Sequence, residues 1–206
     1  MDGIIFDVDG TLWDSTKTVV KSWNQAIREN SDLDMVITDE FLFSLFGKTM
    51  DVICAELFPD FDEAERARLG ELCFAYENRL LETEPGTLYE GVLHTFARLS
   101  EKYPLYIVSN CQCGYIEVML KTTGLGQYVK DTLCFGQTQT SKGKTIRTLM
   151  ERNHLQDVVY VGDTQGDADA CKEADVPFIF ADYGFGKVPG AKRTIHSIGE
   201  LTEMFL

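Results

Sequence analysis

Five short runs of apolar residues recur along the chain, and within each run the apolar positions are nearly continuous. Such continuity is typical of strands that are covered on both faces, as the strands of a parallel sheet are. The pattern therefore predicts five buried strands. They lie at Gly3–Asp7, Leu105–Ser109, Thr132–Gly136, Val158–Gly162 and Val176–Ala181.

Helical patterns separate the later strands. Apolar residues recur there at helical spacing, over roughly 91–102, 115–123, 144–153 and 167–174. Alternation of strands and helices at this spacing is typical of βαβ units. We therefore expect an α/β fold with a doubly wound parallel sheet. In such a sheet the ligand crevice lies beyond the carboxyl ends of the strands, so chemistry is expected at those ends.

The stretch between the first two strands has a different character. It contains no convincing strand, and four helical patterns fill it, over Thr16–Glu29, Asp39–Phe46, Met50–Leu57 and Glu63–Leu81. A helical block inserted after the first strand predicts a separate unit over the crevice. We expect a catalytic core made of residues 1–15 and 84–206, and an inserted α-helical cap domain over residues 16–83.

The charge of the chain limits its partners. The 206 residues carry 19 Lys and Arg against 33 Asp and Glu, which gives a formal net charge of −14. Such a surface repels nucleic acids and anionic membranes over long range, so neither is expected as a partner. An anionic substrate would need a local device that overcomes this field, such as a metal ion, a lysine or a helix N-terminus.

Other features of the sequence favour a cytoplasmic protein. None of the six cysteines forms a C-x-x-C pair, and free thiols are typical of a reducing compartment. The first residues lack the basic region of a signal peptide. No apolar stretch approaches the roughly 20 residues that span a bilayer.

Two acidic motifs follow predicted strands. The first strand runs into Asp7-Val-Asp9-Gly10-Thr11, and the fourth ends in Gly162-Asp163. Because parallel strands open into one crevice, we expect Asp7, Asp9 and Asp163 to gather there. Repulsion among carboxylates favours a hard cation, and oxygen ligands suit Mg²⁺. Each motif alone is also typical of a turn or a helix N-cap, but their joint occurrence at two strand ends favours the metal site.

The motif Asp7-x-Asp9-Gly10-Thr11-Leu12, with Gly162-Asp163-x-x-x-Asp167 downstream, resembles the haloacid dehalogenase superfamily. The resemblance covers the whole chain, because the helical insertion is similar to that superfamily's C1 cap. It implies that Asp7 is a nucleophile that forms an aspartyl-phosphate, and that Asp9 is the general acid and then the general base. It also implies that Mg²⁺ is held by Asp7, the main-chain carbonyl of Asp9, and Asp163.

Phosphate-ester chemistry agrees with these roles. A phosphate monoester repels nucleophiles, so its hydrolysis depends on positioning and charge neutralisation. A carboxylate beside Mg²⁺ can attack phosphorus while a second, protonated carboxyl donates to the leaving oxygen. Two carboxylates in different environments meet this requirement.

Further positions complete the expected site. Ser109 and Asn110 end the second strand, where the family places a hydroxyl that hydrogen-bonds the phosphoryl group. Thr11 is also expected to contact the substrate. Ser141-Lys142-Gly143-Lys144 offers two lysines that could neutralise the phosphoryl charge. We choose Lys142, because its place before a predicted helix fits the family spacing, and interpret Lys144 as solvated.

Two residues keep alternative interpretations. Asp167 either supports the magnesium site or complements the dipole at a helix N-terminus. Lys48, in Phe46-Gly47-Lys48-Thr49 of the helical insertion, either meets an anionic tail of the substrate or is solvated.

The choice of reaction depends on Asp9. By resemblance, haloacid dehalogenases and phosphonatases lack this second aspartate. A β-phosphoglucomutase retains it, but mutases of that type carry an arginine after the loop glycine, and Gly47-Lys48-Thr49-Met50 offers none. We therefore expect a Mg²⁺-dependent phosphatase, similar to phosphoglycolate phosphatases, that hydrolyses a small phosphorylated metabolite through an aspartyl-phosphate. The mutase, and a non-catalytic phosphate-binding module, are the alternatives.

Overall fold

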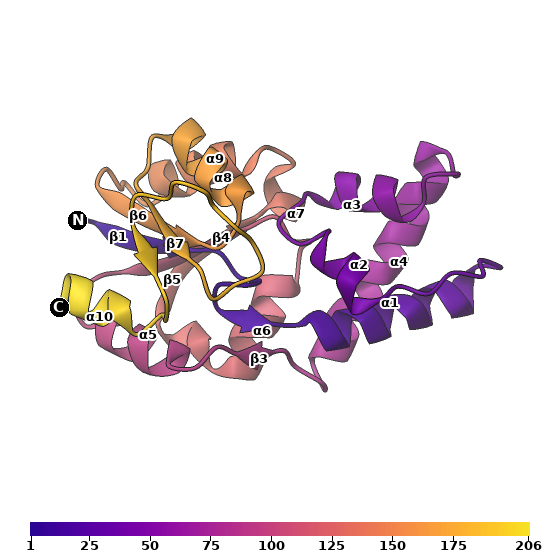
Figure 1. Ribbon diagram of the computed structural model, residues 1–206, viewed down its shortest axis with the longest axis horizontal. Coiled ribbons are helices and arrows are strands. Elements are labelled where there is room, and N and C mark those ends of the chain that lie inside the picture. Colours follow the sequence, from indigo (N-terminus) through magenta and orange to yellow (C-terminus); the bar gives the residue numbers. More distant parts are fainter.

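The computed structural model describes all 206 residues, and a six-stranded sheet lies in the part drawn on the left of Figure 1. The strand order is β5-β4-β1-β6-β7-β8, and all neighbouring strands are parallel. The chain adds strands on one side of β1 and then on the other, so the expected doubly wound α/β fold is confirmed. The strands are β1 (Gly3–Phe6), β4 (Leu105–Ser109), β5 (Val129–Cys134), β6 (Val158–Gly162), β7 (Phe178–Ala181) and β8 (Thr194–Ile195).

Helices cover both faces of this sheet (Figure 1). One face packs against α5 (Val92–Ser100), α6 (Tyr115–Thr123) and α10 (Glu200–Phe205). The other face packs against α8 (Lys142–Arg152) and α9 (Gln165–Ala174). Strand β1 is buried along its whole length between these two layers, which explains why its apolar run is continuous.

A second group of helices lies beside the sheet (Figure 1). It consists of α1 (Thr16–Asn30), α2 (Asp39–Phe43), α3 (Met50–Leu57) and α4 (Glu63–Leu81), which share a separate apolar core of 12 buried residues. The chain enters this helical unit through β2 (Trp13–Asp14) and leaves it toward β3 (Thr87–Leu88), and these two short strands pair antiparallel. No helix of the chain combines the length and the apolar character needed to cross a membrane.

Several element boundaries differ from the sequence expectation. Strand β5 begins at Val129 rather than Thr132, because its first residues are polar or half-buried and lie outside the apolar run. It ends before Phe135, where the short helix α7 (Phe135–Thr138) begins. Helix α8 begins at Lys142 rather than Lys144, since the Ser141 hydroxyl caps its first turn. The two-residue strands are too short to leave a periodic signal, and a 3₁₀ turn (Leu125–Gln127) follows α6.

Candidate active site

Three buried aspartates meet at the carboxyl edge of the sheet. Because β1 lies between β4 and β6, the residues that end these three strands are neighbours in space. Asp7 follows β1 and Asp163 follows β6, while Asp167 lies in the first turn of α9. One carboxylate oxygen from each lies within 4.8 Å of the others. The structure thus brings Asp7 and Asp163 together, as the sequence predicts, but the Asp9 carboxylate that was expected with them lies outside this group and Asp167 joins it instead.

Lys142 is the cation of this cluster. Its Nζ lies 2.9 Å from Oδ1 of Asp7 and 2.6 Å from Oδ1 of Asp167. Burial disfavours the charged ammonium, but the two carboxylates outweigh it and hold the pKa of Lys142 above its usual range. Lys144 is exposed, so the structure selects Lys142 of the two candidate lysines.

The cluster has an excess of negative charge. Three carboxylates face one ammonium, so two negative charges remain when all groups are ionised. Burial and the neighbouring Asp167 raise the pKa of Asp163 to about 7. Burial, with Asp167 as the next cause, also raises the pKa of Asp7 well above its ordinary value. A divalent cation with a preference for oxygen would remove this excess, so the residues fit Mg²⁺.

The turn after β1 fixes the position of Asp163. Gly10 has a φ of +77°, and a Cβ there would overlap the Asp163 carboxylate, so this position requires glycine. The amide of Phe185 donates to Oδ2 of Asp163 at 2.8 Å, and the Thr11 hydroxyl donates to Oδ1 at 3.3 Å. Thr11 is fully buried and its amide donates to Val8. Both donors of Thr11 are thus engaged within the protein, and Thr11 as a substrate contact stays a prediction.

Asp9 is held apart from the cluster by three donors. Trp13 Nε1 and Ser15 Oγ each lie 3.1 Å from its Oδ1, and the Tyr115 hydroxyl lies 2.5 Å away. Because all three bind Oδ1, the other oxygen of Asp9 is free to carry a proton. Burial raises the pKa of Asp9 to about 6, against the opposing effect of these hydrogen bonds. A carboxyl with this pKa can give and take a proton near neutral pH.

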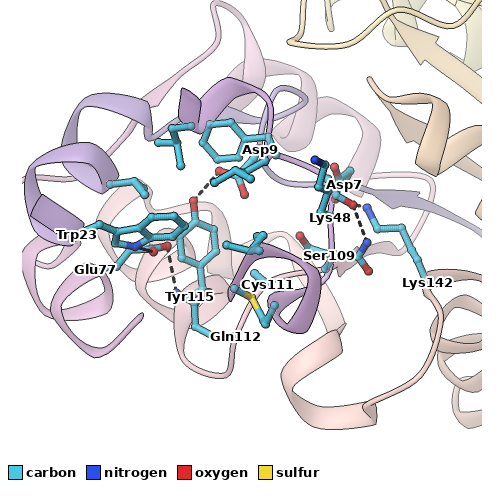
Figure 2. Close-up of a pocket in the computed structure, with 18 residues that line it drawn as sticks. Asp7, Asp9, Trp23, Lys48, Glu77, Ser109, Cys111, Gln112, Tyr115 and Lys142 are labelled. Carbon is cyan, nitrogen blue, oxygen red and sulfur yellow. Dashed lines mark hydrogen bonds and ion pairs between the residues drawn. The ribbon is translucent and has the colours of Figure 1, made fainter. Parts of the chain in front are cut away.

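A cavity of about 50 Å³ joins this edge of the sheet to the helical unit (Figure 2). In the view of Figure 2, the labelled side chains form two groups, with Asp9 between them. Asp7, Ser109 and Lys142 lie at one end of the cavity. At the other end lie Trp23, Glu77, Gln112 and Tyr115, and apolar side chains of the helical unit complete the wall.

The remaining predicted residues also lie at or near the cavity. Asn110 lines it, and its Nδ2 donates to the Gly47 carbonyl at 2.8 Å. Lys48 lines it as well, but its Nζ is paired with Glu56 at 2.7 Å. One oxygen of Asp167 binds Lys142, while the other accepts from the amide of Thr164 at 3.0 Å, as in a capping box. Its place at the N-terminus of α9 is therefore seen, and its role in a magnesium site stays a prediction.

Sequence reasoning missed Glu77 and its partners. Glu77 is only 4% exposed, with Trp23 Nε1 2.5 Å from one carboxyl oxygen and Gln112 Nε2 3.0 Å from the other. Burial raises the pKa of Glu77 to about 8. The available signal was its place at helical spacing from the buried Cys73 and Leu81, which puts a carboxyl in the apolar stripe of α4.

Comparison with known proteins connects this geometry to a family. Residues 4–181 match the sequence model of the haloacid dehalogenase-like hydrolases. A phosphoglycolate phosphatase of Rhodobacter capsulatus is 26% identical over 194 residues, which covers 90% of this chain and 86% of the relative. The pyrophosphatase PpaX of Listeria welshimeri is 25% identical over 177 residues, covering 84% and 79% of the two chains.

A solved structure shows the same fold. The crystal structure of a predicted phosphoglycolate phosphatase from Haemophilus somnus matches with a TM-score of 0.85 at 19% identity, over 100% of this chain and 98% of that one. The family match spans most of the residues described above, including β1, β4, β6 and the aspartate cluster. This chain therefore belongs to the haloacid dehalogenase-like hydrolases.

Proposed function

We propose that this chain is a Mg²⁺-dependent phosphatase that hydrolyses a small phosphomonoester through an aspartyl-phosphate on Asp7. One observation carries the proposal. The buried carboxylate of Asp7 lies beside Lys142, while a second carboxyl, Asp9, is held separately with a pKa of about 6. A nucleophile and an acid–base group in different environments are what phosphomonoester hydrolysis requires. The phosphatase names of the relatives support the same reaction class.

In the first step, an oxygen of Asp7 forms a bond to phosphorus as the bond from phosphorus to the leaving oxygen breaks. Asp9 gives its proton to that oxygen, so that a neutral alcohol departs. Ser109, at the end of β4, and Lys142 offer a hydroxyl and an ammonium to the phosphoryl oxygens. When bound at Asp7, Asp163 and the Asp9 carbonyl, Mg²⁺ would supply charge neutralisation.

In the second step, Asp9 is the base. Now ionised, it takes a proton from a water molecule whose oxygen attacks phosphorus. The bond between phosphorus and Asp7 then breaks, which releases phosphate and restores the Asp7 carboxylate. The three donors on Oδ1 of Asp9 hold the other oxygen in one place for both proton transfers. The net reaction consumes one water and leaves Asp9 protonated for the next cycle.

The helical unit serves as the cap over this reaction, with residues 16–83 as its extent. Among the contacts that tie it to the core, two involve the loop that contains Phe46 and Gly47. The Gly47 carbonyl accepts from Asn110, and the Phe46 ring stacks on Phe185 with the ring centroids 4.7 Å apart. Such closure excludes water from the attacking carboxylate.

The lining of the cavity favours a phosphatase over a mutase. A mutase must hold a second phosphoryl group in the cap, yet no arginine lines the cavity and Lys48 is paired with Glu56. A phosphate-binding module without turnover would have no use for the separately held Asp9. The six cysteines are free thiols, which supports the cytoplasm as the compartment of this activity.

The test is phosphate release from a panel of small phosphomonoesters with and without Mg²⁺. We expect release that depends on Mg²⁺ and is lost in Asp7→Asn. The matched control is Asp14→Asn, since Asp14 lies in β2 and does not line the cavity. No release from any ester would contradict the proposal, and isomerisation of β-glucose 1-phosphate would favour the mutase.

A further inference from the structure

The end of the cavity remote from Asp7 has its nitrogen donors already engaged. Trp23 Nε1 donates to Oε2 of Glu77 at 2.5 Å. The Nε2 of Gln112 lies 3.0 Å from both Oε1 of Glu77 and Oδ1 of Asn78, which accounts for both of its hydrogens. None of these groups is left to donate to a substrate.

Three further side-chain donors of the cavity are also engaged. The Tyr115 hydroxyl binds Asp9, and Nδ2 of Asn110 binds the Gly47 carbonyl. Lys48, the cation that the helical unit contributes, has Nζ at 2.8 and 2.7 Å from the two carboxylate oxygens of Glu56. Its charge is therefore already compensated within the helical unit.

Acceptors, in contrast, remain open. Oδ1 of Asn110 is buried and has no hydrogen-bond partner. Each carboxyl oxygen of Glu77 accepts one hydrogen bond and has a further lone pair available. Asn110 and Glu77 both line the cavity, and a buried acceptor without a donor costs free energy, so the cavity is complementary to a group that brings N–H or O–H donors.

The electrostatic surroundings of Glu77 also favour a substrate that brings a positive group. Glu77 is buried among Trp23, Gln112 and the apolar wall, and burial raises its pKa to about 8. A positive group beside it would stabilise the ionised carboxylate. A carboxylate brought by the substrate would find no uncompensated cation beside Glu77, and would lose most of its hydration without replacement.

We propose that Glu77 and Asn110 select the leaving alcohol, favouring phosphate esters of short amino alcohols and polyols and rejecting esters that carry a carboxylate. This inference rests on the proposed phosphatase function and gives its substrate class. Amino alcohols are the best fit, because an ammonium meets both the open acceptors and the charge of Glu77. Phosphoglycolate, whose far end is a carboxylate, is a poor substrate in this account.

Four esters of similar length test the selection in the unmodified enzyme with Mg²⁺. They are 2-aminoethyl phosphate, 2-hydroxyethyl phosphate, propyl phosphate and phosphoglycolate, with an aryl phosphate as the reference substrate. We expect kcat/KM to fall in that order, with at least about a tenfold difference between 2-aminoethyl phosphate and phosphoglycolate. A preference for phosphoglycolate, or equal rates for all four, would overturn the inference.

Glu77→Gln separates charge from shape. We expect it to lower the ratio of kcat/KM for 2-aminoethyl phosphate to that for 2-hydroxyethyl phosphate by about tenfold, because the ammonium loses its counter-charge. Glu71→Gln, an exposed change on the same helix, should keep the ratio of the unmodified enzyme. An unchanged ratio in Glu77→Gln would contradict the role of Glu77.

The two levels of the proposal fail differently. If the aryl phosphate is hydrolysed but phosphoglycolate is preferred over the amino and hydroxy esters, the phosphatase stands and the selection by Glu77 and Asn110 is wrong. If neither the aryl phosphate nor any of the four esters releases phosphate, the phosphatase itself is wrong. Since the four-ester comparison uses the unmodified protein, it decides the question even if Glu77→Gln does not fold.

Discussion

Magnesium should stabilise the folded chain, and Asp163→Asn should remove most of this effect. The reason is the surplus charge around Lys142. At an effective dielectric constant near 20, two carboxylates whose oxygens lie within 4.8 Å of each other repel by about 3 kcal/mol or more. Lys142 offsets part of this repulsion, and a divalent cation that binds only the folded state relieves the rest. A cation present at one hundred times its dissociation constant adds about 2.7 kcal/mol to the free energy of unfolding.

This free energy corresponds to a measurable rise in the unfolding temperature. For a chain of this size, 1 kcal/mol raises the unfolding temperature by about 2–4 °C, so saturating Mg²⁺ should raise it by about 5–10 °C. The shift should depend on pH. Because the pKa of Asp163 is raised to about 7, the metal-free fold retains a proton that Mg²⁺ must displace at lower pH. The stabilisation is therefore fullest near pH 8 and declines as the pH falls through 7.

Thermal unfolding followed by circular dichroism, with Mg²⁺ titrated at pH 6 and pH 8, measures this effect. The matched control is Asp169→Asn, because Asp169 lies on the same helix α9 but is exposed. We expect the control to show the full shift and Asp163→Asn to lose it. Equal shifts in the two variants, or no shift in the unmodified chain at pH 8, would refute the charge reasoning.

Three further substitutions test single contacts. Tyr115→Phe removes a hydrogen bond that lowers the pKa of Asp9. Because protonated Asp9 is the acid, activity is lost as the pH rises through this pKa, so the alkaline limb of the pH profile of kcat/KM should move to higher pH. An alkaline limb that stays or moves to lower pH would contradict the assignment of Asp9. Glu77→Gln removes a carboxyl whose pKa is raised from 4.5 to about 8, and the unmodified fold loses about 1.4 kcal/mol of stability per pH unit as the pH rises between these values. Urea unfolding should therefore find the variant more stable than the parent by a few kcal/mol at pH 9 and nearly equal to it at pH 4. Equal stability of the two proteins at pH 9 would show that the ionised carboxyl is not destabilised in the fold. Gly10→Ala places a Cβ against Asp163 at a φ of +77° and should lower the free energy of unfolding by about 1–3 kcal/mol, while a variant as stable as the parent in urea would refute the close approach.

The core of the site was predictable because its residues stand in local sequence patterns that can be recognised. Asp7 and Asp163 each follow a continuous apolar run, and a parallel sheet carries both strand ends to one edge. The choice of Lys142 rested on the family resemblance, and its pairing with Asp7 and Asp167 needed the structure. Two lysines stand two residues apart, and only the start of α8 at Lys142 turns one of them inward and leaves Lys144 exposed.

The surroundings of the site were not predictable, for a physical reason. Tyr115 reaches Asp9 from 106 positions away, and Glu77 reaches Gln112 from 35 positions away. The first contact depends on how α6 packs beside the turn after β1, and the second on how the helical unit packs on the core. Local periodicity encodes neither. The start of β5 was predicted three residues too late, at Thr132, because this edge strand begins outside the apolar run, with half-buried polar residues such as Asp131.

The most direct measurement of the central claim is the covalent intermediate. In Asp9→Asn, Asp7 can still attack an aryl phosphate, whose leaving group needs no proton, but the base for the second step is gone. Rapid acid quench of this variant with p-nitrophenyl phosphate and Mg²⁺ should give one p-nitrophenol per enzyme and add the mass of one phosphoryl group to the peptide that contains Asp7. Asp7→Asn should show neither. A phosphoryl group on another residue such as Ser109, or no burst in Asp9→Asn although the unmodified enzyme turns over, would contradict nucleophilic catalysis by Asp7.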